Sequence, residues 1–418
     1  MSTARSQAYT WAIAGALFLF YLSVLIVDRA AGVLYGVLVL LGLIGLLRGQ
    51  AVQARAVWRS HWTLLLACSG PLLAVLANEL SRGQLATRNI DAPLRLALFP
   101  LVLWAVARLP LARLRMLQWC FVLATFAAAI KIHILTAGGT LRYGTDFIPM
   151  ITFAELSLVL GCFSLLSLAW NRRGDRLALL AKCLAAIAAL YCSYVSQSRG
   201  TWVTIPVFIL IMLAATRGSA VPYRRRLAAG LLAVLVLAAG LSPLGRERIA
   251  SAGQDIQQFF EGKNADTSLG FRLQLWRGSL VLLKENPVFG VGIERYPKAL
   301  EQLAERGILT PVAAGFQHSH NELLFAAARL GTLGVLAMLG LIFLPAAWFA
   351  RWLRHADAEV RAVAAMGLCL SLGLFVLGLS DVVFLWWEVY PFYAISVAVF
   401  ASHIDKRRVE VEAASPAR

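Results

Sequence analysis

Residues 317–350, QHSHNELLFAAARLGTLGVLAMLGLIFLPAAWFA, join two kinds of chemistry in one stretch. The later part is mostly apolar and is long enough to cross a bilayer, because a membrane helix needs about 20 apolar residues. The first part holds two histidines, a serine, an asparagine and a glutamate. The stretch therefore predicts a membrane helix with proton-handling side chains at its entrance.

The composition of the whole chain is that of an integral membrane protein. Hydrophobic residues make up 60% of it and charged residues 15%. A soluble domain of this length could not bury so much apolar surface. The first apolar run, residues 11–27, has the length of a span and no small-residue cleavage site, so we expect it to stay as a helix.

Hydropathy predicts an all-α polytopic membrane protein with about twelve transmembrane helices. If the chain crosses the membrane in alternating directions through these helices, most basic clusters lie on one face. By the positive-inside rule this face is cytoplasmic, and both termini lie on it. The predicted spans are about 10–28, 31–47, 62–79, 93–109, 115–137, 148–170, 177–195, 201–216, 227–243, 321–350, 360–379 and 382–402.

The net charge of +17 does not indicate nucleic-acid binding, because about half of the basic residues are explained by topology. The remaining arginines lie on the opposite face, against that bias. The guanidinium group of arginine can donate two parallel hydrogen bonds to a phosphate, so these residues suggest a binding site for a diphosphate. The arginines that matter most are Arg82, Arg88, Arg142, Arg199, Arg272 and Arg277.

We expect four parts in the chain: spans one to nine in 1–244, an external loop domain in 245–320, spans ten to twelve in 321–405, and a cytoplasmic tail in 406–418. In the loop, SLGFRLQLWRGSLVLLKE (268–285) reads as an amphipathic helix. NPVFGVGIERY (286–296) follows it and favours a tight turn, since no strand pattern precedes its G-x-G. A phosphate-binding loop is the weaker reading.

The histidine cluster fits a helix start. Ser319 and Glu322 match the S-x-x-E capping box, which predicts His320 as the first helical residue. The positive end of the helix disfavours an imidazolium, so we expect His320 to stay neutral and accept a proton near pH 7. A neutral outward base suits the activation of a hydroxyl. His318 is a second candidate for this role.

Other interpretations of the histidines stay open. A histidine at a helix start also serves as a cap or an interface residue, and an H-x-H pair also binds metal. Because the outward face has no cysteine and only scattered carboxylates, we expect no metal and no cofactor.

Two further residues stand at outer connections. SQSRGTW places Arg199 between spans seven and eight, where a guanidinium is costly unless it is paired or faces a cavity. LSDVVF places Asp381 in a very short connection between spans eleven and twelve, from which it could orient an arginine or the histidine. A structural ion pair for Arg199 and an ordinary turn for Asp381 are the alternatives.

Several motifs resemble the O-antigen ligase and O-antigen polymerase superfamily. They are SRGTW (198–202), FRLQLW (271–276), NPVFGVG (286–292), and His320-Asn321 followed after nine residues by Gly331 and then Gly334. RYGTDF around Arg142 is similar to the arginine-glycine loop of that family but lacks its following Asn-Pro pair. The resemblance implies a GT-C-like membrane fold with one large periplasmic loop that contains amphipathic helices.

The resemblance implies an O-antigen ligase. Such enzymes transfer a polysaccharide from undecaprenyl diphosphate to a sugar of lipid A-core, by metal-independent inverting transfer on the periplasmic face of the bacterial inner membrane. His320 would take the proton of the acceptor hydroxyl, and Arg199 and Arg272 would hold the diphosphate, with the other four outer arginines as further candidates. The implied partners are the lipid-linked donor, lipid A-core and membrane lipids.

Three alternatives remain. A polymerase and a protein O-oligosaccharyltransferase belong to the same superfamily; a single dominant late loop favours a ligase, since polymerases often carry a second loop near the middle. A lipid or polysaccharide transporter would distribute charges through the membrane midplane, whereas the polar features here concentrate on one face.

Overall fold

The computed structural model describes residues 3–83, 85–141, 147–171, 174–197, 199–216, 253–261 and 263–414. This part of the chain is helical and contains no strand. Eight helical segments in it are long and apolar enough to cross a membrane, by length and composition. The predicted all-α polytopic class is therefore confirmed. The count of twelve stays a prediction, because the expected span 227–243 lies outside the described residues.

Most of the predicted spans coincide with helices of the described chain. The α-helices are α1 (Thr3–Ser23), α2 (Ala30–Gly45), α3 (Ala51–Ser60), α4 (Trp62–Ser81), α5 (Thr87–Ala97), α6 (Phe99–Ala107), α7 (Leu111–Leu135), α8 (Met150–Leu166), α9 (Arg176–Val195), α10 (Arg199–Ala215), α13 (Ser268–Glu285), α14 (Tyr296–Glu305), α15 (Pro311–Ala314), α16 (Glu322–Ala350), α17 (Ala358–Gly378) and α18 (Val389–Ala414). Short 3-10 or π turns join several of them: η1 (Leu46–Gln50), η2 (Ala137–Gly139), η3 (Ser167–Trp170), η4 (Arg351–Arg354) and η5 (Val383–Leu385).

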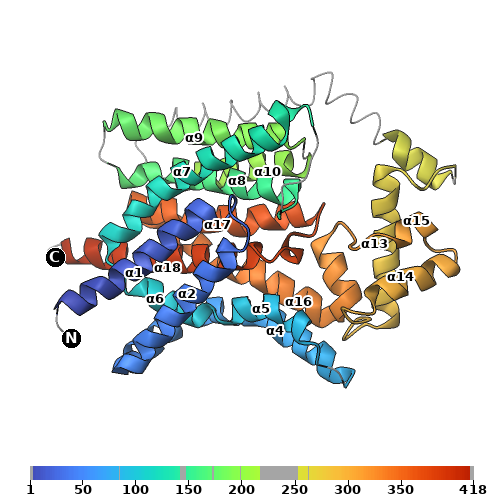
Figure 1. The fold of residues 1–418 in the computed structure, drawn as a ribbon, viewed down its shortest axis with the longest axis horizontal. Coiled ribbons are helices and arrows are strands. Elements are labelled where there is room, and N and C mark those ends of the chain that lie inside the picture. Colours follow the sequence, from blue (N-terminus) through green and yellow to red (C-terminus); the bar gives the residue numbers. More distant parts are fainter. Residues whose placement is uncertain are drawn as a thin grey trace.

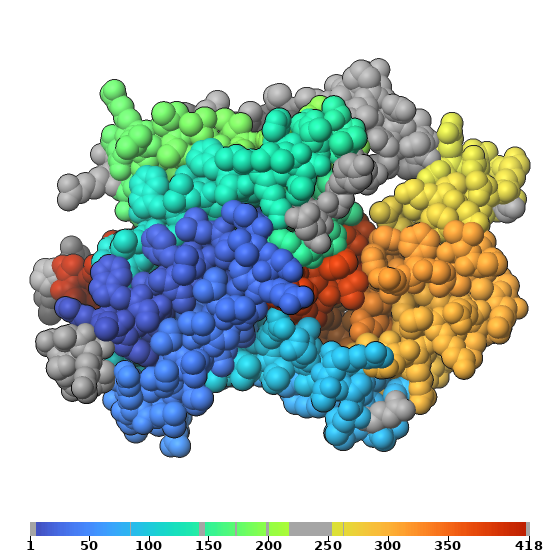
Figure 2. Space-filling model, in the orientation of Figure 1, coloured from blue at the N-terminus to red at the C-terminus, as the bar shows by residue number. Residues whose placement is uncertain are grey.

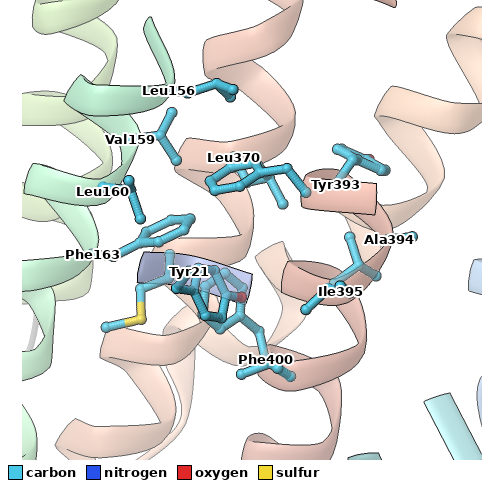
Figure 3. Close-up of a cluster of buried hydrophobic side chains, with 14 of the residues drawn as sticks. Tyr21, Leu156, Val159, Leu160, Phe163, Leu370, Tyr393, Ala394, Ile395 and Phe400 are labelled. Carbon is cyan, nitrogen blue, oxygen red and sulfur yellow. The ribbon is translucent and has the colours of Figure 1, made fainter. Parts of the chain in front are cut away.

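The core lies where α8, α17 and α18 meet. Phe163, Leu370 and Tyr393 are buried there, and Tyr21 of α1 reaches into the same cluster (Figure 3). Helices α8 and α17 are the most buried of the candidate spans, as expected for helices that are apolar all round, and α18 is buried from Val389 to Ile404 except at Tyr390. Figure 1 shows the start of α1 and the end of α18 at one end of the molecule, and α13–α15 at the other.

A network of charged side chains lies at the end of the molecule where α1 begins and α18 ends. Arg115 pairs with Glu359 at 2.7 Å, Arg407 pairs with Asp357 at 2.8 Å, and His403 contacts Glu359 at 2.7 Å. Arg115 and Arg407 come from two of the basic clusters that the sequence places on the cytoplasmic face. The network shows that these clusters lie together in space, away from the histidine cluster.

The helices α13, α14 and α15 form a unit with a core of its own, here called the loop unit. Leu275, Leu282, Leu300 and Leu303 are buried in it, against Phe325 of α16. The predicted helix 268–285 is confirmed with the same bounds. Its apolar face contacts α14, α15 and α16. The loop unit is therefore docked onto the membrane helices through α16.

The NPVFGVG segment forms a turn that runs along α16, which confirms the tight-turn reading. Val291 N–H donates to the carbonyl of Ala328, and Thr332 N–H donates to the carbonyl of Pro287. Helix α16 is broken at Gly331, whose φ is 66° and ψ is −155°. This conformation is open only to glycine. A Cβ on Gly331 would also lie 2.6 Å from Gly290 N and overlap the Val288 carbonyl.

We predict that Gly331→Ala separates the turn from α16 and lowers the free energy of unfolding by about 1–3 kcal/mol through backbone strain alone. Gly340→Ala is the matched control, because the nearest atom to its added Cβ is Leu344 Cδ1 at 3.9 Å. Thermal unfolding of the purified proteins in detergent measures both. Equal Tm values for the two variants would contradict the assigned backbone conformation.

Candidate active site

The segment before α16 differs from the predicted capping box. Helix α16 begins at Glu322, and its cap is Asn321, whose side chain accepts the N–H of Leu324 at 3.0 Å. The hydroxyl of Ser319 instead donates to the carbonyl of Asn321 at 2.9 Å. His320 lies outside the helix with φ 51°. The prediction that His320 is the first helical residue is wrong, because Asn321 takes the capping role.

The two histidines face each other in the turn that this backbone creates. Their ring centroids are 4.4 Å apart with planes at 73°. The backbone N–H of His320 donates to Nδ1 of His318 at 3.3 Å. Phe316 contacts the His320 ring from the loop side, and Phe271 of α13 packs against Phe316. The loop unit therefore contacts residues 318–320, here called the histidine turn, through a short row of aromatic rings.

Asp381 lies beside His320. Its Oδ1 is 3.6 Å from Nδ1 of His320, and the side chains are 8% and 21% exposed. That Nδ1 is buried and makes no hydrogen bond within the described residues. Such distances shorten when the base takes a proton, and separations in ligand-free sites are often this long. Nδ1 faces the carboxylate, which leaves Nε2 as the ring nitrogen able to accept a proton from a substrate.

The segment that carries Asp381 is longer than predicted. Helix α17 ends at Gly378 and α18 begins at Val389, so the very short connection and the span start at 382 are corrected. The carboxylate of Glu322 accepts the N–H groups of Val383 and Phe384 at 2.7 and 2.9 Å. These hydrogen bonds hold the segment out of the helix and fix it to the start of α16.

The environment of His318 favours its neutral form. Burial is the largest cause that lowers the pKa of His318; the neighbouring His320 and Arg272 lower it further, and Asp381 opposes them. His318 therefore gains its proton at a lower pH than an exposed histidine does. A neutral His318 can accept the His320 N–H, as its Nδ1 does here.

Arg199 stands at the start of α10, and the structure describes its backbone only. The next residue, Gly200, is packed so closely that an added Cβ would lie 2.8 Å from the hydroxyl oxygen of Ser380. Ser380 directly precedes Asp381. The start of α10 and the His320–Asp381 pair therefore lie side by side, although they come from distant parts of the sequence.

Arg272 lies in the first turns of α13, near enough to His318 to act on it electrostatically. Its Nε is buried without a hydrogen-bond partner in the described part of the chain, and Nη1 makes only 3.5 Å contacts with Ser268. Arg277 is exposed, one to two turns further along the same helix. The structure therefore brings Arg272 close to the centre and leaves Arg277 at the surface.

Two other predicted arginines have partners in the loop. Arg82, at the end of α4, donates to the carbonyl of Gly290, and Arg88 forms a bidentate pair with Glu294. Both contacts join the membrane helices to the segment between α13 and α14. Arg142 lies outside the described residues.

Sequence reasoning did not find two residues of this region. Glu322 was assigned to a local cap, whereas it connects two distant segments. Arg329, a cation inside an apolar helix, was not among the predicted site residues. It could have been identified from the sequence as a charged residue within a predicted span, because a charge inside the membrane is energetically costly.

The side chains of this site could also bind a metal ion. His318, His320 and Asp381 offer ligand atoms that lie within 4.8 Å of one another. The structure thus supplies the carboxylate companion that the sequence did not place beside the H-x-H pair. Two imidazoles and one carboxylate are ligands typical of zinc sites, so the expected absence of a metal stays a prediction.

Figure 2 shows the loop unit as a yellow and orange lobe beside the membrane helices. Red surface from the late part of the chain is visible between that lobe and the blue N-terminal helices. The histidine turn, which enters α16, and the Asp381 segment, which leaves α17, belong to the junction of these two parts.

We predict that Glu322→Ala lowers both stability and any activity of the site, because the buried N–H groups of Val383 and Phe384 lose their acceptor at about 1–3 kcal/mol each. Glu322→Gln keeps an acceptor oxygen and is expected to retain most of the stability. Glu305→Ala, at an exposed position of α14, is the control. Equal Tm values for Glu322→Ala and Glu305→Ala would show that the connection is not stabilising.

Comparisons with known proteins agree with the motifs. Residues 184–339 match a family model described as O-antigen ligase. An uncharacterized protein of Haemophilus influenzae is 26% identical over 291 residues, which cover 67% of this chain and 71% of that protein. The O-antigen ligase of Escherichia coli is 25% identical over 231 residues, 54% of this chain and 51% of that protein.

The matched region contains Arg199, Arg272, His318 and His320, whereas Asp381 lies beyond it. The chain spans about half the length of the Escherichia coli protein. Residues 184–339 of this membrane protein are therefore similar to the O-antigen ligase family model, and the resemblance indicated by the motifs is confirmed.

Proposed function

We propose that this chain is an O-antigen ligase that transfers a polysaccharide from undecaprenyl diphosphate to a sugar of lipid A-core. The observation that carries the proposal is the His320–Asp381 pair at the junction of the loop unit and the membrane helices. Lipid A-core and the lipid-linked donor are the substrates that the family implies. The active site would face the periplasm, in the inner membrane, with both termini in the cytoplasm.

In the proposed reaction the acceptor hydroxyl gives its proton to Nε2 of His320 as its oxygen attacks the anomeric carbon of the donor. The new glycosidic C–O bond forms while the bond to the diphosphate breaks, so undecaprenyl diphosphate leaves with the electron pair. Attack opposite the leaving group inverts the anomeric centre. The carboxylate of Asp381 stabilises the imidazolium that forms, 3.6 Å from Nδ1 in the resting site.

Arginines would hold the diphosphate and stabilise its charge as it leaves. Arg272 supports this role through its position beside His318 and its buried, unbonded Nε. Arg199 supports it through the placement of its backbone next to Ser380. A guanidinium fork can bind two phosphate oxygens, and fixed cations at a leaving group lower the barrier.

The choice of a ligase rests on the matched family description and on the Escherichia coli relative that is named an O-antigen ligase. A polymerase and a protein O-oligosaccharyltransferase use the same donor and differ in the acceptor. A transporter is a weaker proposal, because the histidine, aspartate and arginine groups converge at one end of the helices.

We predict that His320→Ala abolishes transfer while membrane insertion stays intact. Loss of a general base lowers rates by about 10²–10⁴-fold. The measurement is an in vitro assay in which purified protein is mixed with undecaprenyl-diphosphate-linked glycan and lipid A-core, with EDTA present. Asp381→Asn should retain part of the activity, since the base itself remains.

The same assay separates the alternatives. Longer lipid-linked glycans made without lipid A-core would indicate a polymerase. Full activity of His320→Ala would refute the assigned base. Activity lost in EDTA and restored by one divalent ion would assign His318, His320 and Asp381 to a metal centre instead.

We predict that Arg272→Ala weakens transfer about 10- to 100-fold, the range expected for a lost charge-assisted hydrogen bond, and that Arg199→Ala is similarly impaired. Arg272→Lys should recover only part of the rate because the bidentate fork is lost. The control is Arg306→Ala, since Arg306 pairs with Glu285 within the loop unit. Steady-state rates at several donor concentrations measure the effect, and a normal rate for Arg272→Ala would remove this residue from the site.

A further inference from the structure

Arg329 is a cation within the apolar helix α16. It lies about two turns beyond Glu322, at the end of the segment that precedes the break at Gly331. A guanidinium in a membrane-spanning helix is costly, and such residues almost always face the bundle interior or a cavity. We therefore expect the guanidinium of Arg329 to have an acidic or hydrogen-bonding partner, or to bind a ligand.

The guanidinium has no such partner among the described residues. Its central carbon lies 4.3 Å from the centroid of the Phe325 ring, and the guanidinium makes neither an ion pair nor a hydrogen bond in this part of the chain. Glu322 acts on it electrostatically but directs Oε2 to Val383 and Phe384. Arg329 is also partly exposed, so the charge is open to a ligand.

The backbone at Arg329 is held firmly. Its carbonyl accepts the N–H of Gly292 at 2.9 Å and the side-chain amide of Asn78 at 3.3 Å. These bonds come from the turn before α14 and from α4. The side chain thus starts from a fixed point and lies over an aromatic ring, which limits the conformational entropy lost when it binds an anion.

Arg329 and His318 lie against the same ring. The Phe325 ring is 6.4 Å from the His318 ring, measured between centroids, and 5.1 Å from the Tyr296 ring. Arg272 approaches His318 from the loop unit, whereas Arg329 comes from the membrane helix. The two unpaired cations therefore lie on different elements around the histidine turn.

We propose that Arg329 binds the diphosphate of the polyprenyl-linked donor. The inference rests on the proposed function and adds a substrate-binding residue to it. Arg329 would contribute positive charge from α16, and Arg272 would contribute it from the loop unit. A phospholipid phosphate has the same chemistry, so the experiment compares the two sources directly.

The test measures binding of undecaprenyl diphosphate to the full chain in phosphatidylcholine nanodiscs. Arg329→Gln should weaken binding by about tenfold or more, the loss expected for a charge-assisted contact, and Arg329→Lys should lie between it and wild type. Arg306→Gln is the matched control, because Arg306 forms an ion pair with Glu285 within the loop unit. Equal affinity for Arg329→Gln and wild type would overturn the proposal.

Two further arms exclude a structural explanation. If Arg329 only balances the charge of Glu322, then Glu322→Gln/Arg329→Gln will bind as wild type does, which would overturn the proposal. If phosphatidylglycerol displaces undecaprenyl diphosphate at matched concentration, the residue binds phospholipid and the proposal also fails. Wild-type protein that binds the diphosphate through Arg329 but transfers no glycan would refute the proposed function and leave this inference standing.

Discussion

The geometry of the candidate site depends on how the first residues of α16 bind the connection between α17 and α18. The Glu322 carboxylate accepts two buried N–H groups, of Val383 and Phe384, and the Asn321 side chain donates to the carbonyl of Leu379 at 3.1 Å. The bonded residues lie on both sides of Asp381. His320 directly precedes the same pair of anchoring residues. A displacement of either segment would therefore change the distance between Nδ1 of His320 and the carboxylate of Asp381.

A second constraint comes from the bilayer, where every backbone polar group needs a partner within the protein. The break at Gly331 frees groups of α16, and the turn at residues 287–292 satisfies them: Thr332 N–H donates to Pro287, and the Ala328 carbonyl accepts from Val291. The same contacts dock the loop unit onto the membrane helices. Asn78 of α4 adds a bond to the Arg329 carbonyl. The break is thus the joint at which the loop unit is fixed.

Hydropathy located most helices because the bilayer imposes a length on apolar runs. The spans expected at 177–195 and 148–170 appear as Arg176–Val195 and Met150–Trp170. Local patterns were less reliable at the site. The S-x-x-E pattern predicted a cap, but Glu322 satisfies buried groups of another segment, which no local rule includes. The approach of Asp381 to His320 also depends on tertiary packing, since a whole helical hairpin separates them in sequence.

The two ends of the molecule differ in how closely their charged side chains are paired. Near the chain ends, Arg115, Arg407 and His403 each have an acidic partner at 2.7–2.8 Å, although Nδ1 of His403 is also buried without a hydrogen bond in the described chain. Around the histidine turn, Nδ1 of His320 and Nε of Arg272 are buried without hydrogen bonds in the described chain. Folding gains nothing from leaving such groups unsatisfied, because each costs about 1–3 kcal/mol. Groups that stabilise the fold poorly while converging on one place are better explained by a ligand that completes them. An anionic leaving group beside a hydroxyl donor would do so, since it supplies acceptors to the arginines and a proton to the base.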